Sequence, residues 1–142
     1  MTQEQKQLVK STWSLVESID PVVVGGLFYN QLFEIAPELK HMFRKPVDEQ
    51  SKKLLAMIGY IISRLDRIET VLAEVERLAS RHVSYGVKPE HYATVGDALL
   101  WTLEKGLGKN WNEEVKEAWT ACYLLLANVM INATEEKKQE AA

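Results

Sequence analysis

The stretch LASRHVSYGVKPEHY, residues 78–92, decides how the rest of the chain is interpreted, because it places a histidine at the end of an apolar helical face. Val71, Val75, Leu78 and His82 follow one another at spacings of four, three and four residues. Residues at these spacings share one face of a helix. A histidine on such a face is usually a core or boundary residue bonded to a backbone carbonyl. The bonding partner of His82 is therefore the first question that the sequence raises.

The composition is that of a single soluble domain. The chain has 142 residues, of which 46% are hydrophobic and 26% charged, and a domain of this size buries roughly two-thirds of its unfolded surface. The formal net charge is −3 and both signs are mixed along the chain, so a nucleic-acid partner is not expected. The longest apolar run, Leu54–Ile62, has nine residues, whereas a membrane span needs ~20. Because the N-terminus also lacks a signal-peptide pattern, we expect a cytoplasmic protein that binds no membrane.

Helical periodicity extends over nearly the whole chain, and the four prolines fall where helices begin or separate. The predicted helices cover residues 2–18, 22–35, 48–65, 71–86, 89–103 and 112–130, with a short piece at 38–43 and a bend at LDRIE, residues 65–69. Thr2 with Gln5, Asp20 before Pro21, and Asn112 are the predicted N-caps of the first, second and last helices. Nothing indicates a strand, so the fold class is all-α. The adjacent glycines Gly25 and Gly26 lie inside a helical pattern and indicate close helix packing. We expect one domain over residues 1–134 and a frayed, charged tail over 135–142.

Two further polar side chains are predicted to face the same interior as His82. Gln50 is the polar member of an apolar stripe whose other members are Leu54, Met57, Ile58, Ile61 and Leu65. A buried amide without a partner costs about 1 to 3 kcal/mol, so Gln50 should have one. Tyr29, in the helix 22–35, is placed to reach the same cavity with its phenol. One imidazole and two neutral donors without a carboxylate suit a metal cofactor with a bound small ligand better than hydrolysis.

Other chemistries find little support. The single cysteine, Cys122, excludes an internal disulfide and a thiolate cage, and its place on an apolar stripe is typical of an inert core thiol. The chain contains no H-E-x-x-H, no pair of E-x-x-H motifs of the kind that a di-iron carboxylate bundle needs, and no Gly-rich phosphate loop. His41 and His91 are predicted to be surface or boundary residues. A Ser or Cys nucleophile beside His82 stays open at this stage.

The order of several fragments resembles a known family. These are FYNQLF (28–33), PELKHMF (37–43), DEQSKKLL (48–55), SRHVSYGVKPEHYATVG (80–96) and EAWTACYLLLANVM (117–130). Together they resemble single-domain bacterial globins and the globin part of flavohaemoglobins, with some likeness to neuroglobins, from the first helix to about Asn132. The resemblance implies a globin fold, a three-over-three sandwich of helices A to H with a short or irregular C/D region, and haem b as the cofactor.

The same resemblance assigns roles to individual residues. His82 looks like the proximal ligand of the haem iron, and neutral imidazole in this role donates its other N–H to a carbonyl, for which Leu78 is the expected acceptor. Tyr29 and Gln50 match the distal donors, and Leu54 matches the apolar residue above the iron. The other cofactor contacts implied are Phe43, Lys53, Leu78, Arg81, Val87, Tyr92 and Val95. Lys53 and Arg81, together with Arg44 or Lys45, are expected to pair with the haem propionates.

The resemblance also implies function. Reversible binding of O2, NO and CO is expected, with O2 favoured over CO by the Tyr29 and Gln50 donors, as a monomer or weak homodimer. NO dioxygenation, with Tyr29 and Gln50 as the catalytic residues, would need a separate reductase, because the chain stops where a flavohaemoglobin continues. Thr134 stands where flavohaemoglobins have a proximal glutamate, which argues against strong peroxidase-like activation. Alternatives are a haem-based gas or redox sensor, a partner-binding module on a globin fold, and a haem-free helical bundle.

Overall fold

The computed structural model describes residues 1–43, 45–84 and 87–141, and the side chains among them as far as residue 132, apart from residue 84. Within these residues every regular element is a helix, as the sequence predicts. The α-helices are α1 (Gln3–Glu17), α2 (Pro21–Ile35), α3 (Val47–Ser63), α4 (Leu72–Ser84), α5 (Pro89–Leu107) and α6 (Glu113–Ala141). Three 3-10 helices connect them: η1 (Pro37–Met42), η2 (Leu65–Val71) and η3 (Gly108–Asn110). No helix in this part of the chain is long and apolar enough to cross a membrane.

The helix starts follow from capping residues that the sequence places there. Thr2 accepts a hydrogen bond from the backbone N–H of Gln5, and the Gln5 side chain accepts one from the backbone of Thr2. The Asp20 carboxylate accepts from the backbone N–H of Val22 at the start of α2, where Pro21 occupies the first turn. These bonds satisfy backbone donors that a helix leaves without partners. The predicted caps of the first two helices are therefore confirmed.

The later connections also follow the sequence. The Asn112 side chain accepts from the backbone N–H of Val115 and so caps α6. The predicted bend at residues 65–69 is η2, inside which Arg67 has non-helical backbone angles. α6 runs as far as Ala141 and so includes most of the charged tail for which the sequence predicts fraying. The predicted end of α4 at Gly86 lies outside the described residues.

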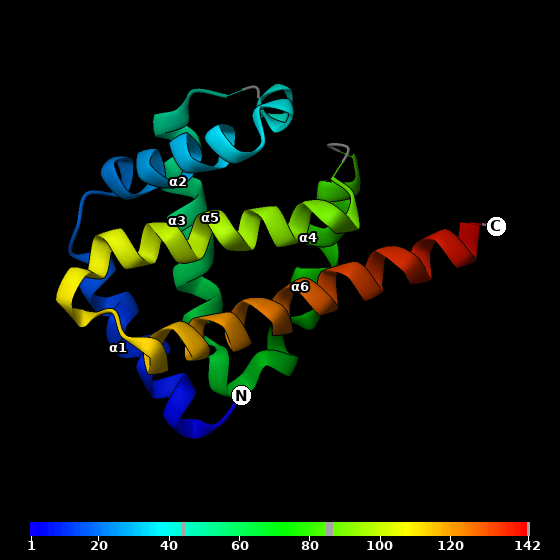
Figure 1. Cartoon of the computed structure of the whole chain (residues 1–142). Helices are drawn as coiled ribbons and strands as arrows, with labels where there is room; N and C mark the ends of the chain where they lie inside the picture. The colour runs from blue at the N-terminus through cyan, green and yellow to red at the C-terminus, as the bar shows by residue number, and fades with distance from the viewer. Residues whose placement is uncertain (44, 85–86, 142) are drawn as a thin grey trace.

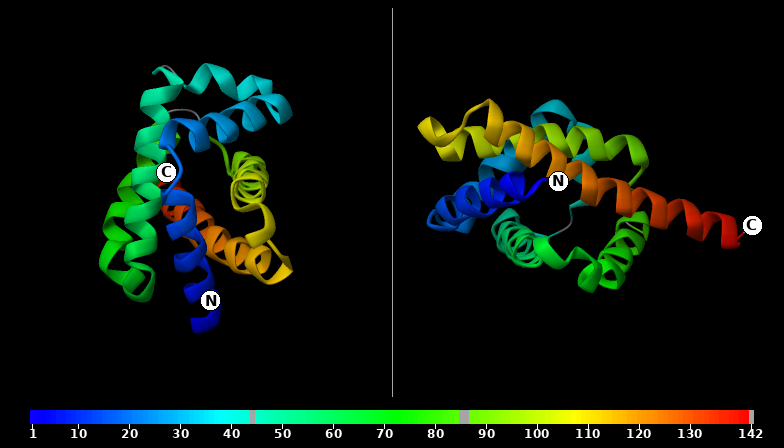
Figure 2. Two further views of the ribbon diagram at one scale, coloured as in Figure 1. Left: turned by 90° about the vertical axis from the view of Figure 1, so that its left-hand side faces the viewer. Right: turned by 90° about the horizontal axis from the view of Figure 1, so that it is seen from below.

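The helices form two layers of three (Figures 1 and 2). One layer contains α1, α3 and α4, and the other contains α2, α5 and α6. Between the layers, α2 packs on α3 while α1 and α4 both pack on α6. Within the second layer, α2 and α6 pack on α5. α3 contacts mainly α2 and α4 contacts mainly α6, while η2 contacts both α3 and α4 and joins them.

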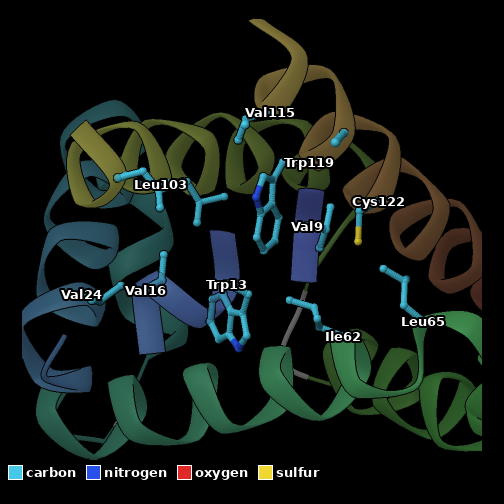
Figure 3. Close-up of a cluster of buried hydrophobic side chains, with 12 residues drawn as sticks. Val9, Trp13, Val16, Val24, Ile62, Leu65, Leu103, Val115, Trp119 and Cys122 are labelled. Atoms are coloured by element: carbon cyan, nitrogen blue, oxygen red, sulfur yellow. The ribbon is translucent and has the colours of Figure 1, made fainter. Parts of the chain in front are cut away.

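The main core lies between α1, α5 and α6 and is closed by α3 (Figure 3). The rings of Trp13 and Trp119 meet in it at 6.0 Å between centroids. The Trp119 indole N–H donates to the Thr12 hydroxyl at 2.9 Å, and that hydroxyl donates to the Leu8 carbonyl at 2.6 Å. Cys122 is buried in the same cluster, as predicted for an inert core thiol. Burial raises the pKa of this thiol to about 11.

Candidate functional site

His82 lies in the last turns of α4, half-buried. Its Nδ1 is 2.8 Å from the carbonyl oxygen of Leu78, one turn back. A carbonyl oxygen only accepts, so Nδ1 carries the proton and donates it. The backbone carbonyl of His82 in turn accepts from the N–H of Val87 at 3.0 Å. The bond predicted between His82 and Leu78 is therefore present.

The protonation of His82 suits metal ligation. Burial lowers the pKa of His82, and the positive charge of Arg81 lowers it further, while the hydrogen bond to Leu78 acts in the opposite direction. The ring is therefore neutral at pH 7. In a neutral ring with its proton on Nδ1, Nε2 carries a lone pair. His82 thus has the tautomer and orientation of a histidine that binds a metal through Nε2.

Tyr29 is at the centre of an aromatic cluster formed by α2 and the residue that follows η1. Its ring meets the edges or faces of three phenylalanine rings, those of Phe28, Phe33 and Phe43, at centroid distances of 5.0, 6.0 and 5.2 Å. Only 4% of Tyr29 is exposed, and burial raises its pKa to about 12. Within the described part of the chain no group is hydrogen-bonded to its hydroxyl. A phenol of this kind has a hydroxyl that can donate a hydrogen bond.

Several residues singled out in the sequence come together around Tyr29. Phe43, Leu54 and Val95 all pack against the same cluster of buried residues. Gln50, one turn before Leu54 on α3, is half-buried, and its side chain has no hydrogen-bond partner among the described residues. The predicted partner of Gln50 is therefore not among the described residues, and Gln50 lies at the boundary instead of being fully buried. That position leaves the amide able to hydrogen-bond a ligand.

A second cluster holds the residues around His82. Leu78 and Tyr92 pack together against buried Val71, Val75 and Ala79. Tyr92 and Val95 are three residues apart on α5, so they lie on one side of that helix. The cluster that contains Tyr92 and the cluster that contains Val95 therefore adjoin along α5. The two clusters contain Tyr29, Phe43, Leu54, Leu78, Tyr92 and Val95, which the sequence analysis assigns to the cofactor and ligand site.

Tyr123 is a residue of this region that the sequence reasoning did not single out. Its hydroxyl donates to the backbone carbonyl of Tyr92 at 2.5 Å. Its ring lies so close to Gly96 that a Cβ there would be 2.5 Å from Cε1 of Tyr123. Tyr123 therefore fixes α6 against the segment of α5 that carries Tyr92. The sequence does contain one sign of this role. Tyr123 carries a hydroxyl within the otherwise apolar stripe of Trp119, Cys122 and Leu126.

The remaining predicted residues lie towards the edge of the site. A cleft of about 200 Å³ opens between α3 and α4, and Leu78 and Arg81 line it together with Met57 and Ile61. Lys53 is exposed on α3, with its ammonium 3.7 Å from the Glu49 carboxylate. The nearby Lys45 ammonium lowers the pKa of Lys53, and Glu49 opposes this effect.

Two of the residues singled out in the sequence cannot be placed in the described part of the structure. Arg44, an expected propionate partner, lies outside the described residues, and so does the side chain of Thr134. His41 is exposed and His91 lies at the boundary, as predicted. His91 accepts from the backbone N–H of Lys88 through Nδ1. Neither of these histidines takes part in the candidate site.

The two-layer sandwich of helices is the architecture that the resemblance to globins implies. The family model described as Globin matches residues 26–130, more than half of the chain, and the chain therefore belongs to the globin family. The flavohemoprotein of Vibrio cholerae is 38% identical over 135 residues, which are 93% of this chain and 34% of that protein. That of Halalkalibacterium halodurans is 32% identical over 145 residues, covering 100% of this chain and 35% of that protein. The chain thus spans about a third of the length of these relatives.

Solved structures agree on the fold. A bacterial globin from Campylobacter jejuni superposes with a TM-score of 0.84 at 28% identity, covering 97% of this chain and 99% of that one. An engineered carbene transferase, described as a putative nitric oxide dioxygenase from Rhodothermus marinus, has a TM-score of 0.84 at 24% identity, covering 99% of this chain and 96% of that one. The second likeness bears on the fold alone. The predicted all-α globin fold is confirmed.

Haem is the prosthetic group that the globin family implies, and the donor set fits it. A neutral imidazole with its Nδ1 proton bonded to a carbonyl is a suitable iron ligand. Among the described residues no group of three or more His, Cys, Asp or Glu side chains could hold a bare metal ion. The apolar clusters around Tyr29 and Leu78 suit a flat porphyrin instead. The chain is thus a haem globin by family and by the chemistry of its site.

Proposed function

We propose that this globin holds haem b through Nε2 of His82 and reversibly binds O2, NO and CO at a pocket formed by Tyr29, Gln50 and Leu54. The observation that carries the proposal is the 2.8 Å bond from Nδ1 of His82 to the Leu78 carbonyl. That bond fixes the tautomer that leaves Nε2 for iron. When bound, haem supplies an iron with a coordination position for a diatomic ligand.

The distal residues select among these ligands by hydrogen bonding. The Tyr29 phenol stays protonated because burial raises its pKa to about 12, so it donates throughout the physiological range. The Gln50 amide supplies a second neutral donor. O2 gains negative charge on binding and CO gains little, so these donors favour O2. A hydrogen bond to a charged acceptor contributes roughly 1.5 to 3 kcal/mol, which predicts tight binding and slow release of O2.

The remaining predicted contacts hold the cofactor itself. Phe43 contributes an aromatic face, while Leu78 and Val95 contribute apolar surface from α4 and α5. Val87 fixes the end of α4 through its bond to the His82 carbonyl. Lys53 and Arg81 are exposed cations and serve the two propionates. Tyr92 lies beside Leu78 and supports the His82 side of the site.

The biological role that we favour is binding or delivery of O2 together with NO detoxification of the dioxygenase type. The curated relatives named flavohemoprotein support this reading. This chain matches about a third of the length of those proteins, and we propose a reductase as the source of electrons for turnover. Such a cytoplasmic globin would work as a monomer or weak homodimer. A gas or redox sensor acting through a partner is the alternative.

Absorption spectroscopy tests the haem assignment. The purified protein is measured after oxidation in air, after reduction under nitrogen and after exposure to O2. We expect a strong Soret band that shifts at each step in the wild type and in His41→Ala, whose histidine is exposed on η1. In His82→Ala the band should be lost or grossly altered. A wild-type protein that gains no Soret band with added haem contradicts the proposal.

Nitrate formation distinguishes the two roles. The reduced, O2-saturated protein is mixed with NO, and nitrate is quantified with and without an added flavin reductase and NADH. Stoichiometric nitrate without the reductase, and repeated turnover with it, are expected for NO dioxygenation. If the protein binds O2 and yields no nitrate from NO, the role is restricted to O2 binding or sensing.

A further inference from the structure

A second hollow of the molecule lies away from the candidate haem site. It is a groove of about 460 Å³ between the C-terminal half of α5 and the start of α6. Its lining consists of Asp97, Leu100, Trp101, Glu104, Trp111, Asn112, Glu113 and Lys116. The helices α5 and α6, which carry most of this lining, are joined by the yellow turn of Figure 1, at the end of α5 that lies away from α4. Its volume falls in the range of roughly 300 to 1,000 Å³ that is typical of small-molecule sites.

Two tryptophans give this groove its character. The other two, Trp13 and Trp119, are buried in the main core with their indole N–H groups bonded to Glu17 and Thr12. Trp101 and Trp111 are half-buried instead and line the groove from α5 and from the residue after η3. Indole faces are the strongest cation acceptors among side chains. An indole that is left at a groove wall therefore favours a cationic occupant.

The molecule itself shows that one of these rings accepts a cation. The Lys105 ammonium lies over the Trp101 ring, 5.7 Å from its centroid. Lys105 is not part of the groove lining. The contact shows that a cation lies at cation–π distance from one face of the Trp101 ring.

The side chains that line the groove carry a net negative charge, which matches a cationic occupant. Asp97, Glu104 and Glu113 contribute three carboxylates, and Lys116 contributes one ammonium. All four belong to exposed residues. The lining is therefore negative, and it combines carboxylate acceptors with aromatic faces.

We propose that this groove binds the guanidinium group of a small alkylguanidine. A guanidinium is planar and weakly hydrated, so it stacks on an indole while its N–H groups donate to carboxylates in the plane. A primary ammonium is a compact, strongly hydrated charge and uses the rings less well. Trp101 and Trp111 provide the faces, and Glu104 and Glu113 provide the acceptors. No residue of this groove belongs to the proposed haem site, so the inference stands without it.

NMR of the four indole N–H groups tests the proposal with internal controls. The ¹⁵N-labelled haem-loaded protein is titrated with butylguanidinium chloride, and separately with butylurea, which has a similar shape without the charge. We expect saturable shifts of the Trp101 and Trp111 indole signals with butylguanidinium. Trp13 and Trp119 should stay fixed because they are buried in the core. Butylurea should leave all four signals in place.

Charge variants locate the site. Glu104→Gln and Glu113→Gln should each weaken butylguanidinium binding about tenfold, because each removes a charge-assisted hydrogen bond. Glu117→Gln makes the same change of net charge at an exposed position of α6 outside the groove, and should leave the affinity unchanged. Lys116→Gln should tighten binding about threefold, since it removes a like charge from the lining.

These measurements distinguish binding in the groove from nonspecific attraction of the cation to a negatively charged protein. Weakening by Glu117→Gln equal to that by Glu104→Gln would show charge screening without a groove site. Indole shifts that do not saturate, or equal shifts with butylurea, would also overturn the proposal. Lys116→Gln keeps the test decisive if an acidic variant proves unstable, because it predicts a gain of affinity.

Discussion

Gly25 of α2 lies directly against Ser51 of α3 where these two helices cross. A Cβ at Gly25 would stand 2.0 Å from Oγ and 2.8 Å from Cα of Ser51, so only glycine permits this approach. The crossing holds together the helices that carry Tyr29 and Gln50. It costs one hydrogen bond, because Oγ of Ser51 is buried without a partner among the described residues. The geometry of the proposed ligand pocket thus depends on a residue that makes no contact with a ligand.

Gly25→Ala should separate the two helices and destabilise the fold. The added methyl meets backbone as well as side-chain atoms of Ser51, which predicts a loss of about 3 kcal/mol in the free energy of unfolding. Gly26→Ala is the matched control, because nothing lies within 4 Å of a Cβ there, and it should gain about 0.5 kcal/mol from helix propensity. Urea unfolding measures both. Equal stability of the two variants would refute the close crossing.

Ser51→Ala should stabilise the protein. The substitution removes a hydroxyl that is buried without a partner, and an unsatisfied polar group costs about 1 to 3 kcal/mol. It keeps the Cβ that packs against Gly25. We expect a gain of about 1 kcal/mol in unfolding free energy and a higher Tm by calorimetry. A loss of stability would mean that the hydroxyl has a partner in solution, such as an ordered water.

The sequence predicts what depends on neighbours along the chain and misses what depends on how helices cross. The caps at Thr2, Asp20 and Asn112 are local, and so is the bond from His82 to Leu78 one turn back. All four are predicted correctly. The close crossing was expected for both glycines, yet only Gly25 makes it, because the register of two helices is set by the whole core.

In the candidate site, too, some residues are predicted from the sequence and other features are missed. Tyr29, Phe43, Leu54 and Val95 were assigned through a family resemblance, and they share one cluster. The partial exposure of Gln50 was not foreseen, since a stripe of apolar neighbours does not reveal where a helix meets the surface. The bond from Tyr123 to the Tyr92 carbonyl spans 31 residues of sequence, and no local pattern encodes such a pair.

Tyr29→Phe tests the distal donor without altering the aromatic packing. The variant keeps the ring contacts with Phe28, Phe33 and Phe43 and loses only the hydroxyl. Loss of one hydrogen bond to a charged acceptor should speed O2 dissociation about tenfold or more, while CO dissociation changes little. Stopped-flow displacement of O2 by CO measures the rate. An O2 off-rate equal to that of the wild type would show that the phenol does not touch the ligand.

Tyr123→Phe should loosen α5 from α6 at Tyr92. The variant removes the hydrogen bond to the Tyr92 carbonyl and keeps the ring that packs over Gly96. We expect a loss of about 1 kcal/mol in unfolding free energy and faster amide exchange in the first turns of α5. Tyr60→Phe, which removes an exposed hydroxyl bonded to Glu74, is the control and should change stability little. Similar losses in both variants would argue that Tyr123 has no special part in holding α5.

Cys122 should report on folding through its reactivity. Burial raises its pKa from 9.0 to about 11, so the thiolate fraction at pH 8 falls about a hundredfold below that of the unfolded chain. An aromatic disulfide reagent should therefore react slowly with the native protein and rapidly in urea. Because the folded pKa is the higher one, this group favours the folded state fully below pH 9, and its contribution is lost as the pH rises towards 11. Cys122→Ala should accordingly show a smaller fall in stability than the wild type across that window, and an identical fall in both proteins would contradict the burial of the thiol.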